Sequence, residues 1–104
     1  MKMNSYSVYD TATAAYMRPF FMQSDGQALR AFTDLATDAE HDIGKHPEHY
    51  SLVRLGTFDD NTGDFNNEKN STITTGLQAV ANSRKIDIHK QRALEAQIKK
   101  ETDE

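Results

Sequence analysis

One segment in the first half of the chain has the spacing of an amphipathic α-helix, and it constrains the fold more than any other feature. Apolar residues recur there every three or four positions and define one face: Ala28, Leu29, Phe32, Leu35, Ala36, Ala39 and Ile43. Ser24 can cap the helix, and Gln27 stands at the capping-box spacing from it. Gly44 suits the position just after the last turn. We therefore predict a helix over roughly residues 25–42.

Segments rich in β-forming residues flank this helix on both sides. We predict strands at residues 5–9, 16–23, 50–58 and 71–75, with Phe65 opening a return strand. Pro19 has no N–H, so the strand that contains it must lie at an edge of the sheet or carry a bulge. Residues 59–64 form a turn cluster, the polar residues 66–70 are predicted to be mobile, and residues 76–82 fit no single element.

The predicted element order is β-β-α-β-β, followed by a C-terminal helical tail. We expect an α+β fold in which one amphipathic helix packs on one face of a small antiparallel sheet. The other face of the sheet is then left to solvent or to a partner. We divide the chain into a single α+β domain, residues 1–82, and a charged tail, residues 83–104, that is helical or partly disordered. The helical part of the tail is predicted at residues 89–100.

Composition limits the classes of protein to which the chain can belong. Its 104 residues suit one small domain and contain no Cys, which excludes disulfides, thiolate metal sites and Cys nucleophiles. No apolar run approaches the roughly 20 residues that span a bilayer, so we expect no membrane partner. The sequence MKMNSYSVYD has no apolar core of a signal peptide, so we expect no secretory signal.

The formal net charge of −4 is unevenly distributed. Residues 1–82 carry six basic and eleven acidic side chains, net −5, whereas residues 83–100 carry six basic and two acidic, net +4. The acidic balance argues against tight, non-specific binding to duplex DNA. The basic segment leaves a nucleic acid or another acidic partner open.

We find no motif for catalysis, and we expect no enzyme, no cofactor and no metal. His41, His46 and His49 cluster in the sequence, but their spacing around Pro47 fixes no ligand geometry, and we interpret them as solvated loop residues. The three acids of the turn cluster, Asp59, Asp60 and Asp64, do not fit the calcium loop of an EF-hand. A hairpin turn is the better interpretation of them.

Aromatic residues lie on or beside the predicted strands, with cations between them. Exposed aromatics on a sheet can stack bases while cations hold phosphates, as in single-strand binding proteins. The alternative is that the aromatics pack against the helix and each other, which we expect of the Phe residues. The predicted DNA-binding residues are Tyr6, Tyr9, Tyr16, Arg18, Arg54, Arg84, Lys85, Lys90 and Arg92. The tail residues among these could instead lie on a solvated helix, or Leu94 and Ile98 could pair with a second copy.

Several pieces of the chain resemble the small nonstructural protein of gokushoviruses, which are single-stranded DNA phages of the Microviridae. The similar pieces span residues 5–65 and keep their order: Ser7-Val8-Tyr9-Asp10, Pro19-Phe20-Phe21, the helix from Ala28 to Phe32, Lys45-His46-Pro47-Glu48, Tyr50, and the sequence LGTFDDNTG of residues 55–63. The last piece makes the resemblance specific. The resemblance implies an early phage protein of the host bacterial cytoplasm that is absent from the virion. It also implies a role in DNA binding at the switch from genome replication to packaging.

Two functional hypotheses follow. The first is a non-enzymatic, dimeric protein that binds single-stranded DNA through the tyrosines, the arginines and the basic tail. The second is an adaptor that binds a phage replication or capsid protein without affinity for DNA. We expect the first if Arg18, Arg54 and the tail converge on one face of the folded protein, and the second if that face is neutralised by acids or is mainly apolar.

Overall fold

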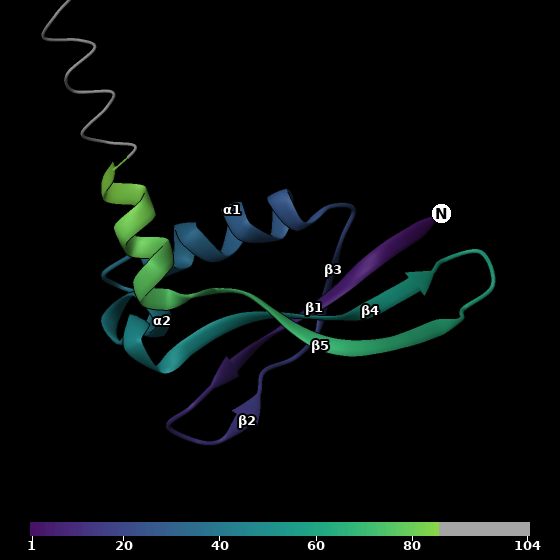
Figure 1. Ribbon diagram of the computed structural model, residues 1–104, viewed down its shortest axis with the longest axis horizontal. Coiled ribbons are helices and arrows are strands. Elements are labelled where there is room, and N and C mark those ends of the chain that lie inside the picture. Colours follow the sequence, from purple (N-terminus) through teal and green to yellow (C-terminus); the bar gives the residue numbers. More distant parts are fainter. Residues whose placement is uncertain (86–104) are drawn as a thin grey trace, which may run out of the picture.

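The computed structural model of the 104-residue chain describes residues 1–85. The labelled elements are β1 (Lys2–Asp10), β2 (Ala15–Tyr16), β3 (Phe20–Met22), α1 (Asp25–Ala36), α2 (Asp42–Lys45), a 3₁₀ turn η1 (Pro47–His49), β4 (Tyr50–Asp59) and β5 (Phe65–Thr75). A further helix over residues 76–85, called here the 76–85 helix, follows β5 directly (Figure 1). The predicted α+β fold with a small antiparallel sheet is confirmed. The predicted helix at 89–100 lies outside the described residues.

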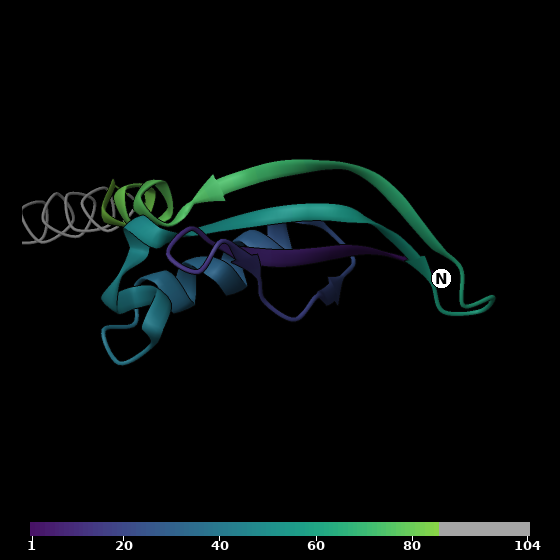
Figure 2. The same ribbon diagram turned by 90° about the horizontal axis from the view of Figure 1, so that it is seen from below.

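The five strands form one antiparallel sheet with the order β2-β1-β4-β5. One edge of β1 pairs with β4 over its whole length. The other edge pairs with β3 near the start of β1 and with β2 near its end. Helix α1 lies on one side of this sheet (Figure 2), and the β4–β5 hairpin projects beyond the helices. The sheet therefore has one covered face and one face without a helix.

The predicted strand at residues 16–23 is broken into β2 and β3. Between them Pro19 cannot donate to the sheet, while Met17 still donates its N–H to the carbonyl of Val8 at 2.8 Å. Both short strands lie at the edge of the sheet, as the proline requires.

Helix α1 begins where the sequence predicts but ends earlier. The Ser24 hydroxyl accepts from the N–H of Gln27 at 3.2 Å, which confirms the N-cap. The helix ends at Ala36 because Asp38 forms its own turn: its carboxylate accepts from the N–H of Glu40 at 2.9 Å. The prediction of a single helix to residue 42 is therefore wrong.

The predicted role of Gly44 after the helix is also wrong. Gly44 lies inside α2, and a Cβ there would collide with the backbone carbonyl of Asp38. Glycine is needed at this position for the close approach of two backbone segments, not for a helix end.

Strand β5 includes residues 66–70, which the sequence predicts to be mobile. Their side chains are polar and exposed. Asn66 and Asn67 pair with Thr57 and Gly56 of β4, and residues 68–70 form an irregular stretch where the register shifts between Arg54 and Gly56. A polar, bulged edge strand of this kind keeps its hydrogen bonds while discouraging pairing with other chains. Residues 76–82, ambiguous in sequence, are helical.

The core lies between the sheet and the helices. Its buried apolar residues come from β1, α1, α2, β4 and the 76–85 helix: Tyr6, Val8, Ala28, Phe32, Ala36, Ile43, Leu52 and Ala79. Because Ala79 is part of this core, the first turns of the 76–85 helix are integral to the domain. The predicted boundary at residue 82 stays a prediction, since it falls within that helix.

Candidate nucleic-acid interface

The register of the sheet assigns each strand residue to one face. Tyr6 and Val8 of β1 point into the core, and their β4 partners Arg54 and Leu52 share that side. The alternate residues therefore lie on the face away from α1, called here the open face. Among the residues that the register pairs, it carries Met3, Ser5, Ser7, Tyr9, Tyr16, Phe21, Ser51, Val53, Gly56, Phe58, Phe65, Asn67, Thr72 and Thr75. None of these side chains is charged, whereas the register does not place Lys69.

Aromatic rings gather at both ends of the open face. At one end the rings of Tyr9 and Tyr16 lie 4.8 Å apart, and Tyr16 is 48% exposed. At the other end Phe58 lies 5.2 Å from Phe21 and 4.6 Å from Phe65 between ring centroids. Phe65 is 64% exposed. Strand geometry puts about 20 Å between the two groups.

A hydrogen bond crosses the open face and ends on Tyr16, one of the rings at its first end. Asn70 of β5 donates its side-chain amide to the hydroxyl of Tyr16 in β2 at 3.1 Å. In a flat sheet these strands, separated by β1 and β4, would lie about 14 Å apart. The sheet and the β5 bulge therefore curl toward the open face, and Ser7 and Val53 beneath the crossing are almost fully buried.

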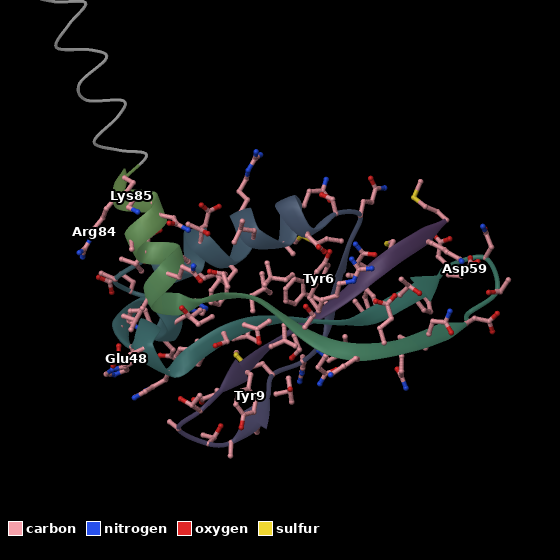
Figure 3. All side chains as sticks on the ribbon, viewed as in Figure 1. Tyr6, Tyr9, Glu48, Asp59, Arg84 and Lys85 are labelled. Atoms are coloured by element: carbon pink, nitrogen blue, oxygen red, sulfur yellow. The ribbon has the colours of Figure 1, made fainter. Side chains whose placement is uncertain are left out.

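Tyr6 cannot take the stacking role predicted for it. Its ring is fully buried in the core, and its hydroxyl donates to Asp25 at 2.7 Å and accepts from the Asn4 amide at 3.0 Å. Burial and the neighbouring Asp25 carboxylate raise the pKa of the Tyr6 phenol, which keeps the hydroxyl a donor. Tyr6 joins β1 to the start of α1 and presents no surface to a base (Figure 3).

Arg54 is not available for the predicted phosphate contact. It lies on the α1 side of the sheet, 3.3 Å from Asp25 and 3.6 Å from Glu68. Two carboxylates neutralise its single charge there. The predicted role of Arg54 is therefore corrected to a structural one, linking β4, β5 and α1.

The other predicted cations do not converge with Arg54. Arg18 is exposed between β2 and β3 and belongs to none of the ion pairs formed within residues 1–85. Arg84 and Lys85 are exposed on the 76–85 helix, at a distance from Tyr9 (Figure 3). Lys90 and Arg92 lie outside the described residues. The described cations therefore do not form the single basic face that was the condition for DNA binding, so a DNA-binding role has to rest on the aromatic rings.

The phenylalanines at the hairpin end were missed as surface residues. The Phe residues are expected from the sequence to lie in the core, yet Phe21 and Phe65 are exposed. The available signal was strand alternation: Phe20 stacks on the buried Tyr6, so its neighbour Phe21 must point the other way.

The acids of the β4–β5 turn serve the hairpin, as predicted. The carboxylate of Asp59 accepts from the N–H of Asn61 at 2.9 Å, and this hydrogen bond lowers the pKa of Asp59. The amino group of Met1 donates to Asp60 at 2.6 Å.

No helix within the described residues is long and apolar enough to span a membrane.

Comparison with known proteins agrees with a phage origin. No curated protein and no solved structure matches the chain. The family model described as Phage ORF5 protein matches residues 3–79, which include every labelled element of the fold except the first residue of β1. The chain therefore belongs to the Phage ORF5 protein family.

Proposed function

We propose that this phage protein is a non-enzymatic single-stranded DNA-binding protein that uses the open face. Its sequence resemblance further suggests a gokushovirus protein of the host bacterial cytoplasm, absent from the virion and active between genome replication and packaging. The observation that carries the proposal is the uncharged open face with exposed aromatic rings at both ends. Base–aromatic stacking is the device by which proteins hold single strands without reading their sequence.

Within residues 1–85, the distribution of charge favours the open face over the α1 side of the sheet. Of the three acids borne by strands, Asp10 lies opposite Tyr50, which packs against the core, and Asp59 lies opposite Lys2 at the hairpin end. The third, Glu68, binds Arg54 on the α1 side. A polyanion that approaches α1 meets carboxylates, whereas one that approaches the open face meets hydroxyl groups and rings. The net charge of −4 therefore restricts where DNA can bind but does not forbid binding.

Stacking supplies most of the affinity in this proposal, and phosphate contacts supply less. The exposed described cations from the predicted set are Arg18, Arg84 and Lys85. With a slope near −0.7 per phosphate contact, three contacts predict about a 20-fold loss of affinity between roughly 50 and 200 mM salt. A protein that used a large basic patch would lose far more.

Fluorescence anisotropy tests the proposal. We expect a labelled oligothymidine to bind the full chain at low salt, with the modest salt dependence given above. A duplex of the same length should bind more weakly, because its stacked bases cannot reach the rings. Absence of oligothymidine binding at low salt would overturn the proposal.

The adaptor hypothesis has its own supporting observation. The open face is uncharged and displays Phe65 at 64% exposure, while Arg54 is neutralised by acids. These are the conditions under which we expected a protein partner, either a second copy of the chain or a phage replication or capsid protein. If DNA binding fails, light scattering of the purified chain and a pull-down of those two phage proteins decide between these partners.

A further inference from the structure

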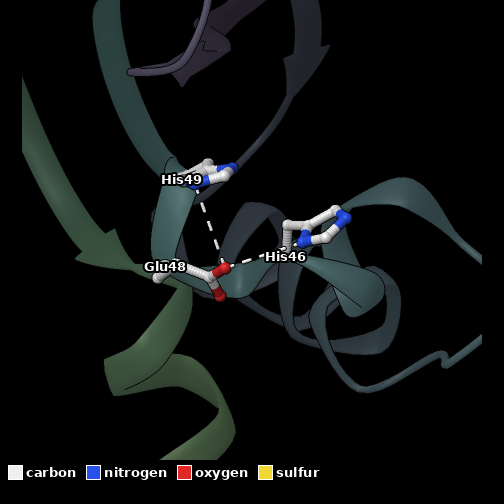
Figure 4. Close-up of side chains that lie close together, drawn as sticks. All are labelled: His46, Glu48 and His49. Atoms are coloured by element: carbon white, nitrogen blue, oxygen red, sulfur yellow. Dashed lines mark ion pairs between the residues drawn. The ribbon is translucent and has the colours of Figure 1, made fainter.

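Three side chains that can bind a metal meet at the turn between α2 and β4. The His46 Nδ1 atom lies 3.6 Å from Glu48 Oε1, and the His49 Nε2 atom lies 3.9 Å from the same oxygen (Figure 4). One ligand atom from each residue falls within 4.8 Å of the others. We propose that His46, Glu48 and His49 form a binding site for a divalent transition metal of the zinc type. This proposal replaces the expectation, made from the sequence, that these histidines are solvated loop residues without a fixed ligand geometry.

The two nitrogen–oxygen separations are close to those that zinc requires, and the two imidazole nitrogens lie within 4.8 Å of each other. Bonds of 2.0–2.2 Å in a tetrahedral arrangement place neighbouring ligand atoms about 3.3–3.5 Å apart. Both nitrogen–oxygen distances exceed this by only a few tenths of an ångström. The imidazole rings lie 5.5 Å apart and are nearly parallel, with the carboxylate oxygen near both. Small rotations of half-exposed side chains therefore suffice to close the site.

The backbone beneath the three ligands is fixed. The N–H of His49 donates to the carbonyl of His46 at 3.0 Å, which closes the 3₁₀ turn. The carbonyl of His49 accepts from both the N–H and the hydroxyl of Thr11, at 2.8 and 3.1 Å. Pro47 restricts the backbone inside the turn. Gly76 packs so closely on Pro47 that a Cβ at position 76 would collide with the carbonyl oxygen of Pro47. A prearranged backbone lowers the entropy that metal binding must overcome.

The donor set selects the class of metal. Two imidazoles and one carboxylate suit zinc and neighbouring transition metals, whereas calcium and magnesium require mainly oxygen ligands. Three protein ligands leave a fourth position for water or for a donor from another molecule. The ligand side chains are 61%, 47% and 42% exposed for His46, Glu48 and His49, so an ion can enter directly from solvent.

His41, the nearest other histidine in the sequence, does not belong to the site. Its Nδ1 atom accepts from the N–H of Ile43 at 3.1 Å and caps α2. It therefore offers a matched control, since His41→Asn keeps an acceptor at the cap while it removes an imidazole from the same loop.

Isothermal titration of the full, metal-free chain with zinc chloride tests the proposal. We expect one ion per chain and a higher Tm in the presence of zinc. Since even the partners of metal ligands typically contribute about 10–100-fold to affinity, the double variant His46→Ala/His49→Ala should bind zinc at least tenfold more weakly. His41→Asn should bind as the native chain does.

Two further measurements make the outcome decisive. Glu48→Gln should weaken zinc binding while it leaves both imidazoles in place, and Co²⁺ bound at the site should show the visible absorption of a tetrahedral complex. Circular dichroism checks that the variants fold, which their exposed positions favour. No zinc binding by the native chain, or equal binding by the native chain and the double variant, would overturn the proposal.

Discussion

Replacing Tyr16 and Phe65 together by alanine should weaken oligothymidine binding by about 30-fold or more. The two residues are the most exposed aromatics of the open face, one at each end. Stacking of one base on an aromatic ring contributes about 1–3 kcal/mol, so two lost rings cost at least about 2 kcal/mol. Anisotropy titrations of the native chain and the double variant at the same salt concentration measure the ratio.

A matched control separates the loss of stacking from a general loss of exposed apolar surface. Leu29 on α1 is 38% exposed, close to the 37% of Phe21, but it lies away from the open face. Leu29→Ala should leave oligothymidine binding unchanged. Equal weakening by Leu29→Ala, or unchanged binding by the double variant, would show that the rings of the open face do not hold the strand.

Substitution of Tyr6 should lower the stability of the fold, because Tyr6 is a core residue. Tyr6→Ala removes a fully buried ring and should lower the free energy of unfolding by about 3–5 kcal/mol, a large part of the stability of a domain this size. Tyr6→Phe keeps the ring but removes the hydroxyl that binds Asp25 and Asn4, so it should cost about 1–2 kcal/mol. Urea unfolding of the three proteins measures both values.

The same variants test the correction of the predicted DNA site. Tyr6→Phe folds with its open face intact, so its affinity for oligothymidine should equal that of the native chain. If Tyr6→Phe kept full stability and bound DNA differently, Tyr6 would have to be a surface residue, and the assignment of the two faces would be wrong.

Local signals in the sequence account for much of the fold. The cap at Ser24, the apolar strand from Tyr50 and the turn of residues 59–64 were all predictable because each depends on neighbouring residues alone. Pro19 correctly indicated an edge position. The element order then restricted the packing to one helix on one face of a sheet.

Other features depend on contacts that a sequence does not display. The end of α1 is decided by a carboxylate of Asp38 that competes with the helix for backbone donors. Residues 66–70 lack apolar side chains, yet they belong to a strand because β4 offers backbone partners to Asn66 and Asn67 and again from Ser71 onward. A glycine is needed at position 44 because the backbone of Asp38, which lies outside α2, approaches it too closely for a Cβ.

The candidate sites show the same division. Alternation along β1 places Tyr6 with Val8 and opposite Tyr9, but the choice of buried face depends on where α1 packs. Arg54 lost its predicted role because Asp25, far away in sequence, lies beside it. The meeting of His46, Glu48 and His49 required the 3₁₀ turn, which Pro47 alone did not predict.

Nuclear magnetic resonance of the labelled chain with oligothymidine tests the central claim most directly. We predict that the amide signals which shift on titration belong to the open face, around Tyr9, Tyr16, Phe21, Phe58 and Phe65, while the signals of α1 stay in place. Shifts confined to α1 and its acidic surroundings, with the open face unchanged, would contradict the claim that this face holds single-stranded DNA.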